Sequence, residues 1–274
     1  MRIKMNDITV INPGLPAPPV AKRFWGGWAT AGYGAVILIV FAIVQVVVVI
    51  LSLLVMVLTR LDLFTNPQHE DVYDSLMAML TGHLGMLQSL ATIISGVLGI
   101  GLIIMFIRAR KGVGIAEYLG LRKITVRGFL IMVAIVIGFA VLSSGLNMLL
   151  GKTDNEQIMY DIYDTSVWPA LFVIAVVVFA PAFEEIFFRG FLFEGFRQSR
   201  IGAIGAIAIT AVIWALIHSF QYGLYSLAWI LILGIVMGIV RLKTGSLWNT
   251  IFLHALVNAV ATLEIALNLD RFIN

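Results

Sequence analysis

The sequence predicts an all-α protein that crosses a membrane several times. Of its 274 residues, 61% are hydrophobic and only 12% are charged, whereas a soluble domain is about half apolar and about a quarter charged. The mean hydropathy is +1.02. Several apolar stretches are long enough to cross ~30 Å of hydrocarbon as helices. Because backbone polar groups must be satisfied inside a bilayer, we expect a polytopic helical bundle of about seven to eight transmembrane helices.

The apolar stretches follow one another along the chain with short polar connections. They lie near 31–58, 84–107, 129–150, 167–197, 201–218, 224–242 and 246–267. Two shorter segments, 71–79 and 115–121, have an amphipathic pattern and are expected to lie at the membrane interface. Insertion of either segment would raise the helix count above seven.

The chain divides into four parts on this basis. Residues 1–28 form a cytoplasmic tail that ends in an interfacial anchor of basic and aromatic residues, and residues 29–166 hold the N-terminal transmembrane helices. Residues 167–267 form a core distinguished by ionisable residues within its apolar stretches, and 268–274 form a short C-terminal tail. The chain has no cysteine, which excludes disulfides, thiolate catalysis and cysteine metal sites.

Lysine and arginine are distributed so as to fix an orientation in the membrane. If all seven stretches cross the bilayer, all but three of the 18 basic residues fall on one side, the exceptions being Arg60, Lys152 and Arg271. This asymmetry predicts a multi-pass protein with the N-terminus in the cytoplasm and the C-terminus outside, and the compact form of the chain favours a prokaryotic plasma membrane. It also explains the basic pI, so we expect the lipid bilayer as a partner and no nucleic acid.

The fourth apolar stretch, 167–197, carries ionisable residues in its middle. Glu184, Glu185 and Arg189 would lie at membrane depth, where an ionised group costs at least ~2.5–3.5 kcal/mol and is usually functional. On a helix, Glu185 and Arg189 are four residues apart and can pair. Glu184 points about 100° away from them, so it needs a partner from another helix.

Two later stretches supply further polar side chains. His218 lies on the fifth stretch, and His254 and Asn258 share a face of the last one because they are four residues apart. Counting along the hairpin between the fourth and fifth stretches brings His218 to a depth similar to that of Glu184. We therefore expect one carboxylate, two imidazoles and one amide to converge in the inner half of the bilayer, in a site facing the cytoplasmic leaflet.

This set of side chains is suited to hydrolysis inside the membrane. A carboxylate beside an imidazole can hold and deprotonate water, and a second imidazole with an amide can donate to a developing oxyanion. The same residues allow an alternative, in which Glu184, His218 and His254 bind Zn²⁺ and leave one position open for water.

Three motifs in this region resemble those of one family. FEEIFFRG at 183–190 matches the E-E-x-x-x-R motif of the CAAX-protease and bacteriocin-processing (Rce1-like, Abi, CPBP) intramembrane proteases. LHALVN at 253–258 matches their H-x-x-x-N motif, and WALIH at 214–218 stands at their F-x-x-x-H motif, with Trp214 in place of phenylalanine. The resemblance covers roughly 168–262, and the earlier helices match only in general hydropathy.

The resemblance implies a role for each residue. Glu184 is the expected general base, which works with His218 on the attacking water, and His254 with Asn258 is the expected oxyanion-stabilising pair. The resemblance implies that Glu185 and Arg189 support the helix or contact the substrate's terminal region. Trp214 is expected to form the aromatic wall that phenylalanine forms in the family.

The expected activity is that of an intramembrane endopeptidase acting on a membrane-associated protein or peptide. In eukaryotic relatives this substrate is the C-terminal tripeptide after a prenylated cysteine, and related members serve peptide maturation or bacteriocin immunity. The family has been described both as metal-dependent and as glutamate proteases. We favour a glutamate protease that requires no metal, because H-E-x-x-H is absent from the sequence.

Other interpretations of the same residues stay open. They are a zinc-dependent version of the enzyme, a non-catalytic membrane scaffold or immunity protein, and a proton-coupled transporter, which the lack of internal repeats disfavours. A partner membrane protein is a further expectation. Glu194, near the cytoplasmic end of the fourth stretch, is expected to be a solvated charge.

Overall fold

A computed structural model describes residues 24–59, 72–151 and 157–267. The predicted tails at 1–23 and 268–274 lie outside the described residues. The helices are α1 (Gly27–Leu58), α3 (Val72–Gly82), α4 (Leu84–Ala109), α5 (Ile115–Leu119), α6 (Val126–Leu150), α7 (Gln157–Asp164), α8 (Pro169–Ile174), α9 (Ala180–Glu185), α10 (Phe193–Arg197), α11 (Gly202–Ile217), α12 (Leu224–Thr244) and α13 (Leu247–Ala266). Two π-helical turns, η1 (Ala175–Phe179) and η2 (Ile186–Leu192), and a 3₁₀ turn, η3 (His218–Phe220), complete the described elements.

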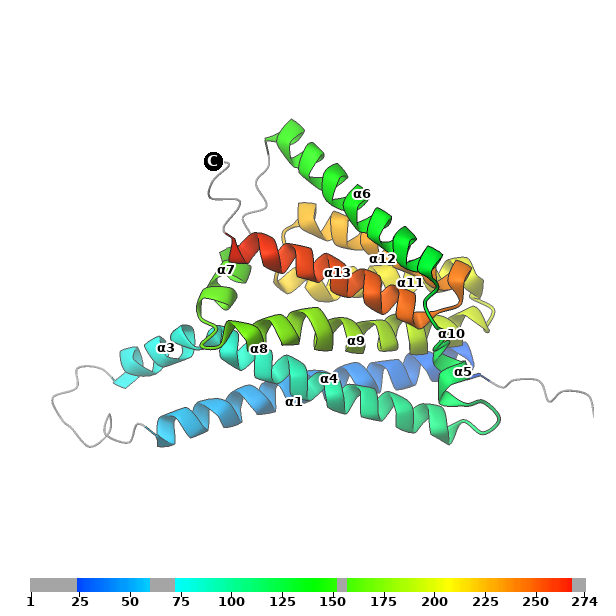
Figure 1. Ribbon diagram of the computed structural model, residues 1–274. Helices are drawn as coiled ribbons and strands as arrows, with labels where there is room; N and C mark the ends of the chain where they lie inside the picture. Colours follow the sequence, from blue (N-terminus) through cyan, green and yellow to red (C-terminus); the bar gives the residue numbers. More distant parts are fainter. Residues whose placement is uncertain (1–23, 60–71, 152–156, 268–274) are drawn as a thin grey trace, which may run out of the picture.

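The described part of the chain contains seven helices that are long and apolar enough to cross a membrane. They are α1, α4, α6, the continuous run Pro169–Arg197, the run Gly202–Phe220, α12 and α13. Each corresponds to one of the apolar stretches predicted from the sequence, so the all-α polytopic fold is confirmed. The connections predicted to be cytoplasmic gather at one end of the bundle, near α5 and α10 (Figure 1). The orientation of that end in a membrane stays a prediction.

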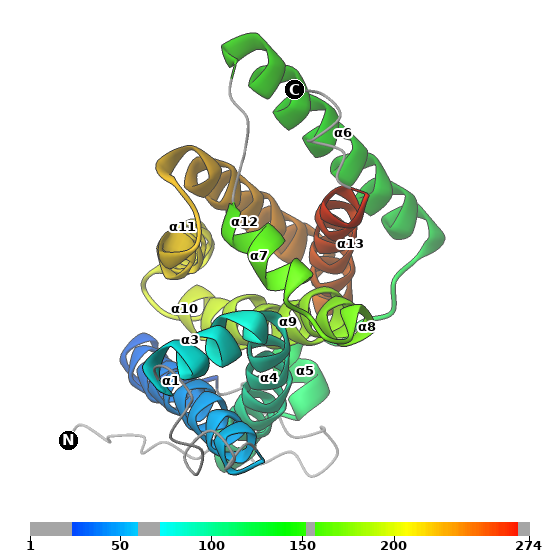
Figure 2. The same ribbon diagram turned by 90° about the vertical axis from the view of Figure 1, so that its left-hand side faces the viewer.

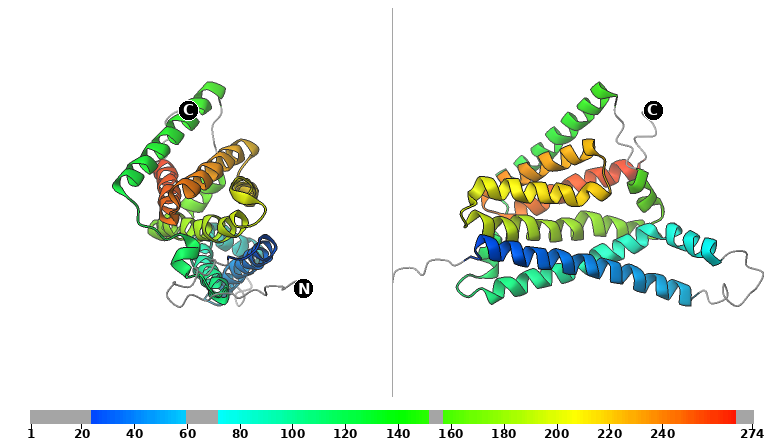
Figure 3. Two further views of the ribbon diagram at one scale, coloured as in Figure 1. Left: turned by 90° about the vertical axis from the view of Figure 1, so that its right-hand side faces the viewer. Right: turned by 180° about the vertical axis from the view of Figure 1, so that it is seen from behind.

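The run Pro169–Arg197 lies between two groups of helices. Figure 2 looks along the bundle and shows α1 and α4 on one side of this run and α11, α12 and α13 on the other. The views from the opposite end and from behind show the same order, with α6 sloping away from α13 (Figure 3). The part of this run that carries Glu185 and Arg189 is buried in protein, whereas Val178 nearer its start is exposed.

Two π-helical turns interrupt the central run, one on each side of α9. Pro181 in the first turn of α9 has no backbone N–H, so it cannot donate to the carbonyl four residues before it. The π-helical turn η1 ends directly before this part of the helix. The second turn, η2, begins at the residue after Glu185 and contains Arg189. Such turns are frequent at functional sites, because each rotates the following side chains relative to a regular helix.

Small residues allow α4 to approach the central run closely. Gly99 of α4 lies against the ring of Phe183, where an added Cβ would be 2.5 Å from Phe183 Cε2. Phe183 in turn stacks on Phe41 of α1, with ring centroids 4.2 Å apart. Helices in membranes associate through such close contacts, because lipid removes most of the hydrophobic driving force between them.

The short helix α5 packs against protein at the end of the bundle, while its predicted place at the membrane interface stays a prediction. Tyr118 and Leu119 are buried, and Leu119 lies so close to η2 that a Cβ on Gly190 would be 2.8 Å from Leu119 Cδ2. Burial, and next the Glu194 carboxylate, raise the pKa of the Tyr118 hydroxyl, so it stays neutral at physiological pH. The amphipathic pattern of this segment therefore reflects packing against protein at the end of the bundle.

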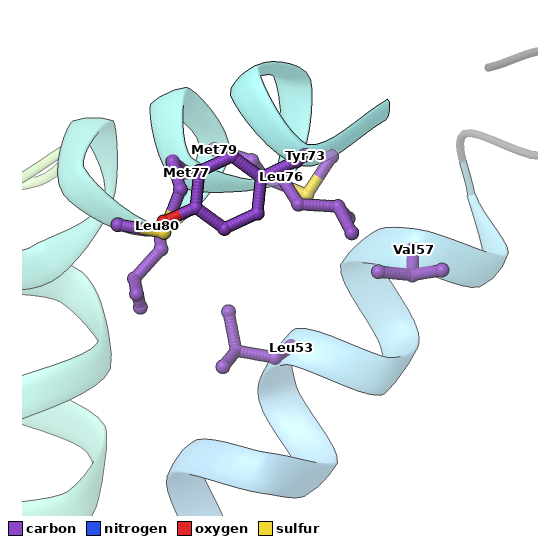
Figure 4. Close-up of a pocket in the computed structure, with 7 residues that line it drawn as sticks. All are labelled: Leu53, Val57, Tyr73, Leu76, Met77, Met79 and Leu80. Atoms are coloured by element: carbon purple, nitrogen blue, oxygen red, sulfur yellow. The ribbon is translucent and has the colours of Figure 1, made fainter. Parts of the chain in front are cut away.

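A pocket of about 330 Å³ lies between α1 and α3, away from the predicted site (Figure 4). It is lined by Leu53, Val57, Tyr73, Leu76, Met77, Met79 and Leu80. Apart from the Tyr73 hydroxyl this lining is apolar, so it offers no acid–base pair and no metal ligand set. We assign it no chemistry.

We predict that Gly99→Ala destabilises the bundle, whereas Gly101→Ala does not. The added methyl group at position 99 meets the ring of Phe183, whereas nothing lies within 4 Å of a Cβ at Gly101 on the same helix. Overpacking of this kind costs about 1–3 kcal/mol. Thermal unfolding of the two purified variants in detergent measures the difference, and equal melting temperatures would contradict the packing described here.

Candidate active site

The predicted site residues come from three helices that meet in the middle of the bundle. Glu184, Glu185 and Arg189 lie on the central run, Trp214 and His218 lie at the end of α11, and His254 and Asn258 lie on α13. They form two hydrogen-bonded groups that share Trp214 as a common neighbour.

The first group is a buried ion pair with a histidine. Arg189 Nη1 donates to Glu185 Oε1 at 2.9 Å, and both side chains are fully buried. His254 Nδ1 lies 3.1 Å from the same carboxylate oxygen and is also buried. The predicted pairing of Glu185 with Arg189 is therefore present. Arg189 has no exposed surface in this structure, which favours the predicted supporting role over the predicted contact with a substrate.

Arg189 is also bonded to the neighbouring helix α12. Its Nη2 donates to the carbonyl of Gly234 at 3.2 Å. Among the residues that the structure describes, two atoms of the ion pair, Glu185 Oε2 and Arg189 Nε, are buried without a hydrogen-bond partner. An unpartnered buried polar atom is costly.

The second group contains Glu184 and His218. Glu184 is half-buried, and its Oε2 accepts a hydrogen bond from Trp214 Nε1 at 2.5 Å. His218 is half-buried as well, and its Nδ1 lies 2.7 Å from the carbonyl oxygen of Trp214. Trp214 is the partner from another helix that the sequence required for Glu184, and it also binds His218.

The indole ring of Trp214 connects the two groups. It meets the ring of His218 at a centroid distance of 5.0 Å and that of His254 at 5.2 Å, both in T-shaped geometry. The guanidinium carbon of Arg189 lies 4.8 Å from the centre of the indole, within the range of a cation–π contact. The two imidazoles therefore flank one aromatic side chain that is itself buried.

Asn258 lies on the same face of α13 as His254, but its amide is directed to a main-chain group. Asn258 Nδ2 donates to the carbonyl of Val176, in the π-helical turn η1, at 2.9 Å. An amide nitrogen carries two hydrogens, so one remains for a further acceptor. This hydrogen bond anchors Asn258 against the central run at Val176, about two helical turns before Glu184.

Glu184 and His218 lie on the two arms of the hairpin that the α10–α11 turn joins. Glu184 is near the midpoint of Pro169–Arg197, and His218 follows the last residue of α11, at the end away from that turn. At 1.5 Å per residue, Glu184 lies about 20 Å from the turn and His218 about 25 Å. The two residues are thus at similar depths along the bundle, and their position in the inner half of a bilayer stays a prediction.

The hydrogen bonds fix which nitrogen of each imidazole is free to react. A carbonyl only accepts, so the contact with Trp214 makes Nδ1 of His218 the donor and leaves a lone pair on Nε2 in the neutral ring. Glu185 similarly takes the Nδ1 hydrogen of His254. In its protonated form, His254 would donate from Nε2, with Glu185 compensating the charge.

The zinc alternative requires Glu184, His218 and His254 to converge on one ion. Among the residues that the structure describes, no three His, Cys, Asp or Glu side chains are grouped so that they could hold a metal ion. Glu184 binds the indole and His254 binds Glu185 instead. As placed here, these three side chains do not converge on one metal ion.

Glu194 is a correction to the sequence analysis, because it is buried and not solvated. Its carboxylate accepts from Arg197 Nη2 at 2.6 Å and lies 3.8 Å from Arg241 Nη2. Arg241 is buried too, and it donates from Nε to the carbonyl of Arg189 and from Nη2 to that of Leu119. Glu194 and Arg197 are three residues apart and can pair on one helix face, but no signal in the sequence places Arg241 beside them.

Comparison with known families agrees with the motifs. Residues 166–260 match the family described as type II CAAX prenyl endopeptidase, Rce1-like. This confirms the resemblance, and the matched segment contains every residue of the two hydrogen-bonded groups. No curated protein gives a significant match to the chain, and neither does any solved structure. At family level, the match supports a CAAX-type membrane protease, which is a hydrolase.

We expect Glu185→Ala to lower the unfolding free energy by about 3–5 kcal/mol, because it leaves the buried guanidinium of Arg189 unpaired. The double variant Glu185→Ala, Arg189→Met removes both charges and should lose less stability than the single variant. Thermal unfolding in detergent measures both, with Asp74→Ala on the exposed face of α3 as the control. A Glu185→Ala melting temperature equal to that of the wild type would argue against the buried pair.

Proposed function

We propose that the chain, whose residues 166–260 match the Rce1-like family, is an intramembrane endopeptidase that hydrolyses a peptide bond by activated water. The observation that carries the proposal is the shared attachment of Glu184 and His218 to Trp214. It attaches a carboxylate and an imidazole to one residue within the matched segment, and this supports their assignment as a pair that acts on water. A carboxylate and an imidazole together can deprotonate a water molecule.

The proposed reaction uses the chain's own residues at each step. Glu184 and the Nε2 lone pair of His218 hold the water, whose oxygen attacks the carbonyl carbon of the scissile bond while Glu184 takes one proton. The carbonyl oxygen becomes an oxyanion, to which His254 and Asn258 donate. The intermediate then collapses, the C–N bond breaks, and the proton on Glu184 passes to the leaving amine.

The substrate class follows from the position of the site. Helices cover the site from several sides, so a substrate must reach it from within the membrane or from its surface. We propose a membrane-associated protein or peptide, with CAAX-type processing or related peptide maturation or immunity as the activity. A prokaryotic plasma membrane and a site facing the cytoplasmic leaflet are parts of the same proposal.

The proposal predicts that Glu184→Ala and His218→Ala abolish cleavage without loss of membrane insertion. The assay uses purified protein in lipid with a peptide pool that includes lipidated C-terminal peptides, read by mass spectrometry. Asp74→Ala serves as the control. Products that the wild type and the Glu184→Ala variant form equally would contradict the mechanism.

Repeating this assay with a strong chelator separates the two forms of the enzyme. We expect Glu184-dependent products to survive chelation, because His218 and Glu184 activate water without a metal in the preferred mechanism. Products that disappear with chelator and return with Zn²⁺ would favour the zinc-dependent alternative. If no peptide is cleaved, while a Glu184→Gln variant rescues the cellular phenotype of a deletion, the non-catalytic scaffold or immunity role is favoured.

Asn258→Ala should leave partial activity, lower by ~10²–10³-fold, as expected for the loss of one oxyanion donor. The reduction should fall on kcat, because the interaction forms only in the transition state. Asn147→Ala on α6 is the matched control, since Asn147 pairs with Tyr225 away from the site. An unchanged kcat for Asn258→Ala would remove this residue from the mechanism.

A further inference from the structure

The chain departs from its family's pattern at one position of the site. Trp214 stands where the F-x-x-x-H motif has phenylalanine. A phenylalanine there would provide an aromatic wall and no hydrogen bond. The indole adds one N–H, which can only donate, and this N–H is bonded to the Glu184 carboxylate.

We propose, on the basis of the function proposed above, that Trp214 is a positioning residue for the water-activating pair. Its indole N–H determines which oxygen of Glu184 faces the water, and its main-chain carbonyl, which any residue at this position would supply, determines which nitrogen of His218 does. The role of the tryptophan itself goes beyond that of an aromatic wall, because the indole N–H is a specific donor to Glu184.

The first half of the argument concerns the carboxylate. Glu184 Oε2 accepts the indole N–H of Trp214, so Oε2 is committed as an acceptor and Oε1 is left to meet the water. The proton taken from water therefore goes to Oε1. Trp214 on α11 thus orients Glu184 on the central run. A base on a helix that faces lipid would have no such donor.

The second half concerns the imidazole and depends on how α11 ends. The backbone N–H of His218 bonds to the carbonyl of Ala215, because the chain tightens into the 3₁₀ turn η3 at this point. Carbonyls at a helix C-terminus lack their usual intrahelical donors. The carbonyl of Trp214 instead receives the Nδ1 hydrogen of His218, which orients Nε2 and its lone pair away from the helix end.

Trp214 is held firmly enough to act in this way. It is 2% exposed, and Gly234 of α12 lies against its ring, where an added Cβ would be 3.1 Å from Trp214 Cε3. Arg189 lies over the indole and donates to the carbonyl of the same Gly234. The indole is thus fixed by contacts from α12 and from the central run, and its N–H holds the Glu184 carboxylate in turn.

The test is the substitution Trp214→Phe, which restores the family's residue, keeps the aromatic ring and removes the N–H. We expect kcat to fall about 10- to 100-fold, the range for a lost hydrogen bond to a charged group, with KM changed less than about threefold. Trp229→Phe, which alters a tryptophan packed against Phe139 outside the site, should stay within about twofold of the wild type. A Trp214→Phe enzyme with wild-type kcat, or one changed only in KM, would overturn the positioning role.

A second readout does not depend on activity. The indole ¹H–¹⁵N resonance of Trp214 should move when Glu184 is replaced by alanine, and it should not move in the Asp74→Ala variant. A Trp214 resonance that is insensitive to Glu184→Ala would overturn the proposal even if the protein proves to be an active protease. If the wild type cleaves nothing, the proposed function fails, while the resonance still decides whether Trp214 holds Glu184.

If Trp214→Phe does not fold, the N–H is removed with less change of shape. Benzothienylalanine at position 214 keeps the bicyclic ring and replaces the N–H with sulfur. Reduced kcat in this variant, with a wild-type melting temperature, supports the proposal. Wild-type kcat contradicts it.

Discussion

The buried ion pair of Glu185 and Arg189 is the constraint on which the rest of the structure depends. Neither charge has access to solvent, and an unpaired charge at membrane depth is expensive. The pair therefore fixes its own surroundings: α12 provides the carbonyl of Gly234 and α13 provides His254. Three helices are registered against each other by polar contacts, in an environment where apolar packing alone discriminates weakly between alternative alignments.

Glu184 is connected to this buried ion pair indirectly, through Trp214. Glu184 does not belong to the ion pair, since it points to another side of the same helix. It reaches Trp214, whose ring lies against both Arg189 and His254. The groups that touch a substrate in the proposed reaction are therefore positioned by groups that do not. This division is common in enzyme sites, where supporting side chains hold the reactive ones in a productive geometry.

The remaining helices bury the central run and hold its end near α5. α1 and α4 cover one side of the central run through close contacts such as that of Gly99 with Phe183, while α11, α12 and α13 carry the site on the other. At the end of the bundle near α5, a second buried cluster around Glu194 and Arg241 joins α5, the central run and α12. Polar contacts thus fix the central run at its middle and near one end.

The sequence by itself determined the number and order of the membrane helices, because a helix must be long and apolar enough to cross the hydrocarbon, and this can be read from each stretch. It also determined the pairing of Glu185 with Arg189, which needs only helical spacing, and it predicted the candidate residues of the site. Only the tertiary structure decided that Trp214 binds Glu184, that Asn258 is anchored on Val176, and that Glu194 is buried beside Arg241. These contacts join residues 30, 82 and 47 positions apart, and they depend on helix rotation and on the π-helical turns, which hydropathy and spacing along one helix do not encode.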